Sequence, residues 1–393
     1  MHRIFLSLAA VGALAGCNEA PQESPAGSPV ASIDTPAAEG AALASLHADD
    51  AGRLIMSWVE TGGDEARLLV AARDRAGWSQ PTTVATGSDW FVNWADFPSL
   101  LANGDIWATH WLEKVADSTY AYAVRVALSD DGGQSWSEPL TPHDGSPTEH
   151  GFVSYFPDEA GIGLVWLDGR ETGEGGPMTL RTATLAGDRE LTGAALLDDR
   201  VCDCCQTDAA LTAEGPVVVY RDRTEKEIRD IQLVARRGNL WQPPVRVAAD
   251  NWTLPACPVN GPAVVADQQQ VAVAWYSGAQ GPRVSVVRSD DGGRSFGDPV
   301  VIETVQALGR VDAVLLDDGR LAVSFVDQLA PEEAEIAVAL VNGSEVERIR
   351  IGKTDPARSS GFPRMALNAD GLWVVWRQID SAGERLQLHR VTL

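Results

Sequence analysis

The chain has 393 residues and a formal net charge of −24, from 31 basic and 55 acidic side chains. An acidic excess of this size disfavours binding to nucleic acid or to anionic lipid through a basic face, and it favours solubility. The sequence contains no nucleotide-binding loop, no nucleophile elbow and no His-Glu-x-x-His zinc motif, so these chemistries are excluded.

The first 16 residues resemble the signal peptide of a bacterial lipoprotein. Arg3 supplies a positive charge, residues 4–16 are apolar, and a Leu-Ala-Gly-Cys sequence ends at Cys17. The apolar run is shorter than the roughly 20 residues that a membrane-spanning helix needs. The pattern predicts lipidation of Cys17 and attachment to a membrane through that anchor alone. By the same resemblance, Asn18 is typical of sorting to the outer membrane of a Gram-negative bacterium.

Residues 17–40 are rich in Pro, Ala, Ser and Glu and have almost no aromatic content. A segment of this composition cannot bury a core, so we predict a flexible tether. Residues 41–393 are expected to form a single repeat domain, because repeat folds exceed the usual length of one domain.

A short unit recurs seven times in residues 41–393. It consists of a turn, usually with glycine, an alternating apolar run and a final aromatic residue. The final residues are Trp58, Trp111, Trp166, Tyr220, Trp275, Phe325 and Trp376. Their spacing of about 50 to 55 residues is typical of propeller blades. The pattern predicts an all-β, seven-bladed β-propeller.

Each unit reads as a series of short antiparallel strands. A first strand precedes the turn, as in residues 97–101, and a half-buried third strand follows the aromatic residue, as in residues 121–128. The chain ends on a third strand, residues 386–393, so the last blade lacks a fourth strand. Residues 29–33 could supply it, and this pairing would remove exposed sheet edges. We therefore predict that strands from the two termini close the ring.

Two segments fit the pattern Ser-x-Asp-x-Gly-x-x-Trp/Phe, Ser129–Trp136 and Ser289–Phe296. Each follows a predicted third strand. An aspartate can bind its own turn backbone, glycine accepts positive φ, and the aromatic residue can anchor the turn to the sheet. The pattern predicts tight turns between third and fourth strands, with weaker versions at residues 73–78 and 237–241.

This motif resembles the Asp-box, or BNR repeat, of the sialidase-like propellers, and the resemblance covers essentially all of residues 41–393. It implies that the motifs are structural, and it offers the six-bladed sialidase propeller as the alternative architecture. A sialidase also needs three arginines, an acidic acid/base and a Tyr/Glu nucleophile pair. Its first arginine usually lies in Phe/Tyr-Arg-Ile/Leu-Pro, whereas residues 97–100 read Phe-Pro-Ser-Leu and Arg364 follows a Phe-Pro pair in the last unit. The resemblance therefore predicts architecture more than activity.

Functional residues are expected in the loops that enter the first strands or leave the second strands, because these loops share one face near the axis. Arginines can grip carboxylates, paired carboxylates can act at a glycosidic bond, and aromatic rings can stack on sugars. The acid/base candidates are Asp96, Asp168, Asp222 and Glu227, and the ligand-binding candidates are Arg170, Arg223, Arg229, Arg310, Arg364 and Trp94. We predict that this face binds a glycan or another anionic or polyhydroxylated ligand. The protein could also hydrolyse the glycan that it binds. The alternatives are a solvated rim of salt bridges and a scaffold that docks envelope proteins.

Four cysteines remain besides Cys17, and their spacing is unusual. They are Cys202, Cys204, Cys205 and Cys257. Cys202 and Cys257 are 55 residues apart, the same separation as Tyr220 and Trp275. They therefore occupy the same position in adjacent units, which predicts four neighbouring thiols on the axial loops.

Three interpretations of these thiols stay open. An exported protein meets an oxidising compartment, which favours a Cys202–Cys257 disulfide. Thiolates also bind soft metals such as copper or zinc, with His150 as a candidate further ligand. Beside a Cys202–Cys257 disulfide, Cys204 and Cys205 would form a strained, labile and reactive pair or stay free.

Overall fold

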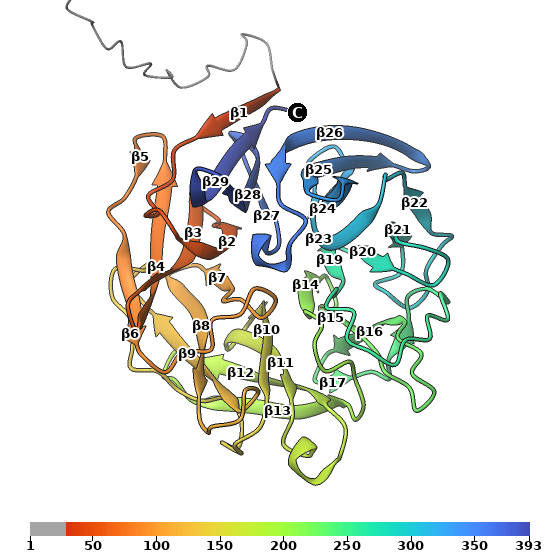
Figure 1. The fold of residues 1–393 in the computed structure, drawn as a ribbon. Helices are drawn as coiled ribbons and strands as arrows, with labels where there is room; N and C mark the ends of the chain where they lie inside the picture. Colours follow the sequence, from red (N-terminus) through yellow and green to blue (C-terminus); the bar gives the residue numbers. More distant parts are fainter. Residues whose placement is uncertain (1–28) are drawn as a thin grey trace, which may run out of the picture.

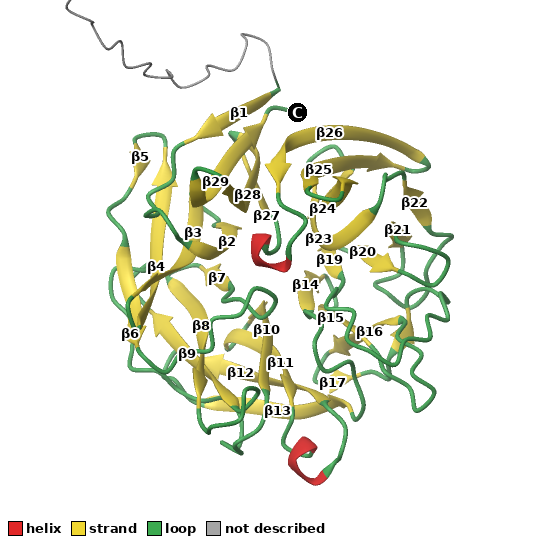
Figure 2. Ribbon diagram, in the orientation of Figure 1, coloured by secondary structure: helices red, strands yellow, loops and turns green. Residues whose placement is uncertain are grey.

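The computed structural model describes residues 29–393, which form seven antiparallel sheets around a central axis (Figure 1). The predicted all-β, seven-bladed propeller is confirmed, and the six-bladed alternative is wrong. Helix is confined, within the described range, to two three-residue 3-10 turns, η1 (Thr172–Glu174) and η2 (Arg358–Ser360) (Figure 2). In this part of the chain no helix has the length and apolarity to cross a membrane. The predicted signal peptide and Cys17 lie outside the described residues.

The strands of each blade follow one another outward from the axis. Blade 1 contains β2 (Ala42–Ala48), β3 (Leu54–Gly62), β4 (Glu65–Asp74), β5 (Gly77–Trp78) and β6 (Thr82–Gly87), and blade 2 contains β7 (Leu100–Asn103), β8 (Ile106–Lys114) and β9 (Tyr122–Ser129). Blade 3 contains β10 (His150–Asp158), β11 (Gly161–Asp168), β12 (Thr179–Ala186) and β13 (Leu191–Asp198), and blade 4 contains β14 (Asp208–Thr212), β15 (Gly215–Arg221), β16 (Ile231–Arg237), β17 (Leu240–Trp241) and β18 (Val245–Arg246).

The remaining three blades have four strands each. Blade 5 contains β19 (Ala263–Asp267), β20 (Gln270–Ser277), β21 (Arg283–Ser289) and β22 (Val300–Ile302), and blade 6 contains β23 (Ala307–Leu315), β24 (Leu321–Ala330), β25 (Glu333–Asn342) and β26 (Glu345–Thr354). Blade 7 contains β27 (Arg364–Asn368), β28 (Gly371–Asp380), β29 (Gly383–Val391) and β1 (Val30–Ile33).

The seven aromatic residues that end the repeated units all lie in second strands and are buried, none with more than 4% of its surface exposed. They pack between neighbouring sheets. Trp58 of blade 1, for example, shares a core cluster with Trp373 of blade 7. Large aromatic side chains contribute much of the burial energy of a core, so the repeat seen in the sequence is the repeat of inter-blade packing.

Strands from the two ends of the propeller close the ring, as predicted. β1 pairs antiparallel with β29, with Val30 opposite Val391 and Ile33 opposite Leu388. The two strands lie side by side at the top of Figure 1. β1 falls within the range expected to be tether, so the folded region begins before residue 41. Its backbone groups satisfy the outer edge of blade 7, which would otherwise be exposed.

Both Ser-x-Asp-x-Gly-x-x-Trp/Phe motifs form the tight turns that their chemistry predicts. In the first motif, Oδ1 of Asp131 accepts the backbone N–H groups of Gln134 and Ser135, each at 2.9 Å. The N–H of Gly132 donates to the carbonyl of Asp105, in the turn between β7 and β8. The motif therefore lies at the end of the blade away from the loops that enter the first strands.

The second motif repeats this hydrogen bonding. Asp291 accepts the N–H groups of Arg294 and Ser295, each at 2.9 Å, and Gly292 donates to the carbonyl of Gln269 in the β19–β20 turn. The next glycine, Gly293, has a φ of +82°, which glycine adopts without strain. The two motifs thus have the same structural role in blades 2 and 5.

Side-chain acceptors near the axis tie neighbouring blades together. In each case an Asp or Asn at the start of one blade accepts an N–H from the first strand of the next blade. The pairs are Asp96 with Phe152, Asp208 with Val264, Asn260 with Arg310, and Asp312 with Met365, at 2.6–2.8 Å. These contacts place two predicted site residues, Asp96 and Arg310, within the framework of the ring.

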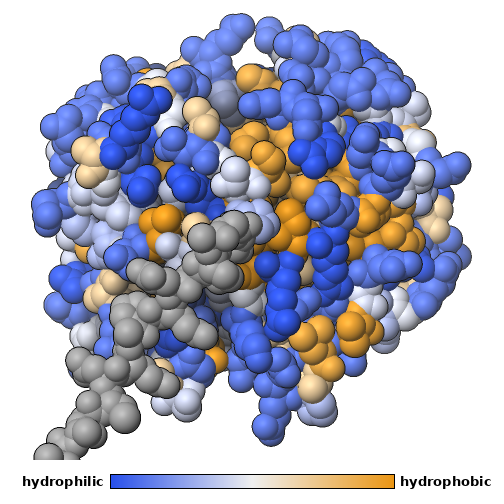
Figure 3. All heavy atoms as spheres, turned by 90° about the horizontal axis from the view of Figure 1, so that it is seen from above, coloured by the Kyte–Doolittle hydropathy of each residue, from blue (hydrophilic) through white to orange (hydrophobic). Residues whose placement is uncertain are grey.

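The face seen from above Figure 1 is mainly hydrophilic, with apolar areas between charged side chains (Figure 3). Isolated exposed apolar residues such as Val346 of β26, which is 37% exposed, are ordinary on protein surfaces.

Candidate functional site

A pocket of about 330 Å³ opens among the loops that enter the first strands and those that join second to third strands. We call this side of the ring the axial face and this cavity the axial pocket. Blades 2, 3, 4, 5 and 7 all contribute to its wall. The residues used below are Phe91, Trp94, Asp96, Tyr120, Tyr122, Glu149, Asp203, Cys204, Cys257 and Arg358. A volume of this size lies in the range of small-ligand sites.

A tyrosine joins two carboxyl groups at the base of the axial pocket. The hydroxyl oxygen of Tyr122 lies 2.8 Å from Oε1 of Glu149 and 3.1 Å from Oδ2 of Asp96. The hydroxyl has one hydrogen, so it can donate to only one carboxylate at a time. Burial raises the pKa of Glu149 to about 8 and that of Asp96 to about 7. At neutral pH the three groups therefore hold at least one proton on a carboxyl oxygen.

Only one of these three groups is available to a ligand. Asp96 and Tyr122 are 2% and 1% exposed, and Oδ1 of Asp96 is already used by the N–H of Phe152. Glu149 is half-buried and reaches the pocket wall. The close approach requires Gly151, because a Cβ at that position would lie 1.9 Å from Oδ2 of Asp96. Glu149 is thus the contact group, and Tyr122 and Asp96 position it.

Aromatic rings form one wall of the pocket. Phe91 stacks on Tyr122 with ring centroids 4.2 Å apart, and the exposed ring of Tyr120 meets the edge of Phe91. Trp94, the predicted sugar platform, stacks on Phe362 and has the guanidinium group of Arg310 5.2 Å from its ring centre. Tyr120, which is 60% exposed, is the more accessible ring for a ligand.

Arg310 is used inside the protein. Its side chain donates to the carbonyls of Pro356, Ala357 and Gly361 and to Oγ of Ser360. Burial lowers its pKa to about 10. Arg310 therefore holds the loop before β27 in place, and the backbone oxygens already occupy the donors that a substrate carboxylate would need.

Arg223 and Arg229 meet at the carboxylate of Glu227. Arg223 binds Glu227 at 2.9 Å and Asp203 at 2.9 Å, and Arg229 binds Glu227 at 2.8 Å. Hydrogen bonds from Arg223 hold the pKa of Glu227 below its usual range. Arg229 is buried and also donates to Sγ of Cys202 at 3.0 Å. Glu227 is therefore an ionised partner of two arginines.

Two further candidates lie elsewhere on the ring. Oδ1 of Asp222 accepts the backbone N–H of Arg223 at 2.7 Å, and burial raises the pKa of Asp222. Arg364 lies 3.4 Å from Asp312 and lines a second cavity of about 260 Å³ between the first strands. The predicted arginines thus have separate environments, and only Arg223 and Arg229 share a partner.

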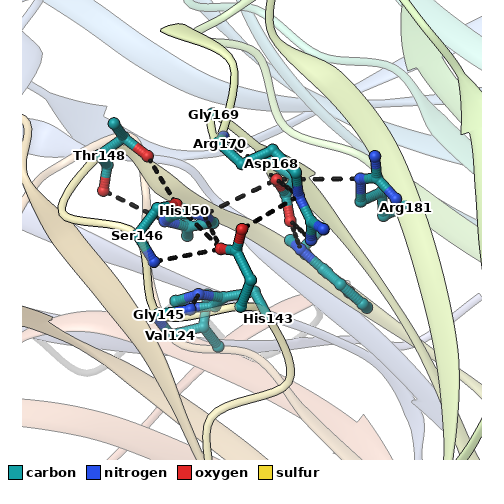
Figure 4. Close-up of polar contacts among 12 residues, drawn as sticks. Val124, His143, Gly145, Ser146, Thr148, His150, Asp168, Gly169, Arg170 and Arg181 are labelled. Atoms are coloured by element: carbon teal, nitrogen blue, oxygen red, sulfur yellow. Dashed lines mark hydrogen bonds and ion pairs between the residues drawn. The ribbon is translucent and has the colours of Figure 1, made fainter. Parts of the chain in front are cut away.

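Asp168 and Arg170 belong to a polar group between blades 2 and 3 (Figure 4). Asp168 is buried and accepts hydrogen bonds from Arg170 at 2.7 and 2.8 Å and from Nε1 of Trp166 at 2.8 Å. Burial alone would raise the pKa of Asp168, but these hydrogen bonds lower it to about 2. A carboxylate this strongly paired is a structural anion and a weak base.

The same group contains two stacked histidines, whose ring centres are 3.7 Å apart. The ligand atoms of His143, Asp144 and His150 lie close enough together to surround a cation. However, both ring nitrogens of His143 face backbone N–H groups, those of Val124 and Gly145, at 3.1 and 3.2 Å. This ring has no free lone pair for a metal. His150, a predicted partner of the cysteines, contacts this group instead (Figure 4).

The cysteines gather beside the axial pocket, as their spacing predicts. Sγ of Cys202 lies 3.2 Å from Sγ of Cys205 and 3.9 Å from Sγ of Cys204. Cys257, from the loop before β19, interacts with Cys204. Cys202 and Cys205 are buried, Cys204 is half-buried and Cys257 is exposed.

The predicted Cys202–Cys257 disulfide is not formed, and all four cysteines of the described residues are free. A turn at Asp203 and Cys204 brings Cys202 against Cys205 of the same loop. Burial opposes ionisation of Cys202, but contacts with Cys204, Cys205 and Arg229 bring its pKa well below the ordinary value. Cys202 therefore ionises more readily than an ordinary thiol, next to a guanidinium group.

Sequence reasoning missed Tyr122, Glu149, Tyr120 and Arg358. Glu149 directly precedes β10 and so lies in a loop that enters a first strand, as Asp96 does. The rule that selected Asp96 would therefore also have selected Glu149. Tyr122 begins a third strand, where the alternation of apolar and polar residues predicts that it is buried. Nothing in the sequence indicates that its hydroxyl contacts two carboxyl groups. Arg358 belongs to η2, which the strand pattern does not predict.

These features define a seven-bladed β-propeller with a pocket of carboxyl, aromatic and thiol groups on its axial face. The chain matches no protein-family profile and no curated protein. Among solved structures it is similar to the BP39L lectin from Burkholderia pseudomallei, with 15% identity, a TM-score of 0.61, and coverage of 90% of this chain and 96% of that one. It is also similar to a PL25 ulvan lyase, with 12% identity, a TM-score of 0.60, and coverage of 92% and 96%.

The NanB sialidase of Streptococcus pneumoniae also matches, with 12% identity over 91% of this chain and 69% of that one. Its TM-score of 0.43 is too low to support an argument about this protein. Identities of this order show a shared fold alone, so the function must be inferred from the site itself.

Proposed function

We propose that this protein binds an uncharged, polyhydroxylated glycan in the axial pocket. The observation that carries the proposal is the contact of the Tyr122 hydroxyl with the carboxyl groups of both Glu149 and Asp96 at the pocket base. A protonated carboxyl group donates and accepts hydrogen bonds, as sugar hydroxyls do. The exposed ring of Tyr120 supplies an apolar surface on which a sugar ring can stack.

The charge of the pocket favours a neutral ligand over an anionic one. Glu149, Asp96 and Asp203 line it together with one cation, Arg358, whereas Arg310, Arg223 and Arg229 bind protein groups. A sialic or uronic acid would therefore find a single arginine in place of an arginine pair. The sequence predicted an anionic or polyhydroxylated ligand, and the charges of the pocket favour the neutral, polyhydroxylated class. Of the two similar propellers named above, one is a lectin and the other is a lyase bound to a saccharide of GlcA and Rha3S, an acidic glycan. They support a glycan ligand, and the choice of a neutral glycan rests on the pocket of this protein alone.

The test is binding to an array of neutral and acidic glycans, followed by calorimetry on the best ligand. We expect the wild-type protein to prefer neutral glycans and Glu149→Ala to weaken binding about tenfold, in line with loss of one or two hydrogen bonds. Glu347→Ala is the matched control, because it makes the same truncation on the exposed outer strand β26. Preference for acidic glycans, or equal affinity of both variants and wild type, would overturn the proposal.

Hydrolysis is the second candidate, and the raised pKa of Glu149 specifically favours it. An acid with a pKa of about 8 is protonated at neutral pH and can donate to a leaving-group oxygen. The second carboxylate of the same wall is Asp203, which is half-buried and paired with Arg223. If the protein hydrolyses its glycan, we expect Glu149→Gln to abolish release of reducing ends while part of the binding remains. Unchanged turnover would exclude Glu149 as the acid.

We further propose that Cys17 carries a lipid anchor and that the propeller works at the outer membrane. The signal-like residues 1–16 support this location. In a Gram-negative host, labelling with an alkynyl fatty acid should mark the wild-type protein and miss Cys17→Ser. An unlabelled wild-type protein would contradict the anchor. Docking of envelope proteins on the axial face remains the alternative function.

A further inference from the structure

We propose that Cys202, Cys204, Cys205 and Cys257 form a thiolate site for one soft d¹⁰ cation, Zn²⁺ or Cu⁺, in the wall of the axial pocket. The proposal is independent of the glycan ligand. It rests on the placement of three sulfur atoms with the fourth cysteine beside them, on the group that compensates their charge and on the route by which an ion can reach them.

The sulfur geometry fits a metal. The Sγ atoms of Cys202, Cys204 and Cys205 all lie within 4.8 Å of one another, with two of the separations at 3.2 and 3.9 Å. Zinc–sulfur bonds of about 2.3 Å in a tetrahedral site place the sulfurs roughly 3.8 Å apart. The three side chains can therefore surround an ion with only small adjustments.

The fourth ligand comes from the neighbouring blade. Cys257 precedes β19 of blade 5, whereas the other three cysteines precede β14 of blade 4. Cys257 interacts with Cys204, and both line the axial pocket. The Sγ atom of Cys257 lies outside the group of three sulfur atoms that are all within 4.8 Å of one another, so the Cys257 side chain must move inward to complete the shell. A metal held by all four would join two blades and complete a four-sulfur shell, the number that structural zinc sites use.

Arg229 supplies a compensating charge. Its side chain is 3% exposed, donates to Sγ of Cys202 at 3.0 Å and is held by the carbonyl of Leu254 at 2.8 Å. A buried guanidinium group directed at a sulfur stabilises a thiolate, and a four-thiolate site with a divalent ion carries a net negative charge. Such outer contacts hold ligands in position around a metal.

The ion has a route to the site, and its binding needs no redox step. Cys257 is exposed and Cys204 is half-buried, so the open side of the cluster faces the axial pocket. Each thiol that is still protonated releases one proton to solvent as its sulfur binds the ion. The ion keeps its oxidation state.

The experiment measures metal binding by the reduced full-length protein without any glycan. Zn²⁺ and Cu⁺ are titrated separately against a competing chelator, and the bound metal is measured by elemental analysis after gel filtration. We expect one equivalent of at least one cation, with four thiols protected from a thiol reagent until the metal is removed. Cys204→Ser and Cys257→Ser, at the two accessible positions, should each weaken binding at least tenfold.

Cys17→Ser is the matched control, because it removes a cysteine outside the cluster and should leave the stoichiometry and affinity unchanged. Circular dichroism of each variant shows that it is folded. The proposal is overturned if the reduced protein binds neither cation, or if both cluster variants bind as tightly as the control. It is also overturned if the isolated protein contains two disulfides that form in preference to the metal site. Loss of glycan binding in a protein that still binds metal would count against the proposed function alone.

Discussion

The behaviour of the site depends on a few side chains whose ionisation is set by burial. Glu149 and Asp96 share the hydroxyl of Tyr122, and both have pKa values raised by burial. Asp168 is also buried, yet its pKa falls to about 2 because Arg170 and Trp166 donate to it. Glu149 is therefore protonated at neutral pH, whereas Asp168 is ionised. The hydrogen bonds that Asp168 accepts from Arg170 and Trp166 cause this difference.

The raised pKa values predict how stability depends on pH. Glu149 titrates at about 8 in the folded protein against an ordinary value of 4.5, so the folded state keeps a proton that the unfolded chain releases between these values. The free energy of unfolding should therefore fall as pH rises from 5 to 8. Glu149→Gln cannot ionise and should reduce this fall by on the order of 1–3 kcal/mol.

Urea denaturation at pH 5 and at pH 8 measures the effect. Glu347→Gln, exposed on β26, should keep the wild-type pH dependence. If Glu149→Gln also keeps it, Glu149 is ionised in the folded protein.

At the scale of elements, the two Ser-x-Asp-x-Gly-x-x-Trp/Phe turns stabilise blades and take no part in the axial pocket. Their hydrogen bonds run to their own backbone and to the β7–β8 and β19–β20 turns. The sequence of the motif was enough to predict the turn geometry, because the hydrogen bonds that Asp131 and Asp291 accept join residues within four positions of one another. The functional loops at the other end of the blades lack such local rules.

Replacement of Asp291 tests this separation of roles. Asp291→Ala removes two side-chain and two backbone hydrogen bonds and should lower the free energy of unfolding by about 1–2 kcal/mol. Glycan affinity should not change. Asp290→Ala, at the exposed neighbouring position, is the control and should leave both quantities unchanged. A loss of glycan affinity in folded Asp291→Ala would show that the motif contributes to the ligand site.

At the scale of the whole molecule, the ring depends on a strand contributed by the N-terminal side. β1 covers the outer edge of β29, and Thr392 donates to the carbonyl of Pro29. A closed ring has no single weak edge, whereas removal of one outer strand exposes a row of unpaired backbone groups.

Deletion of residues 29–33 tests the closure. The variant loses a strand with four paired positions, and the free energy of unfolding should fall by roughly 2–4 kcal/mol at about 0.5–1.5 kcal/mol for each hydrogen bond. Thermal denaturation and light scattering would show a lower melting temperature and greater self-association. Replacement of residues 29–33 by a Gly-Ser segment of equal length is the control for chain length and should behave like the deletion. An unchanged melting temperature would mean that β1 contributes little to the stability of the ring.

The sequence by itself determined the number of blades, the place of the seven aromatic residues in the second strands, the terminal closure and the grouping of the four cysteines. All of these follow from periodicity, because equivalent positions in successive units occupy equivalent places in the ring. The contacts that individual polar side chains make depended on tertiary structure. Tyr122 meets Glu149 and Asp96 from separate loops, and Cys202 meets Cys205 in place of Cys257. Such contacts depend on side-chain packing between blades and within loops, which a repeat pattern does not encode.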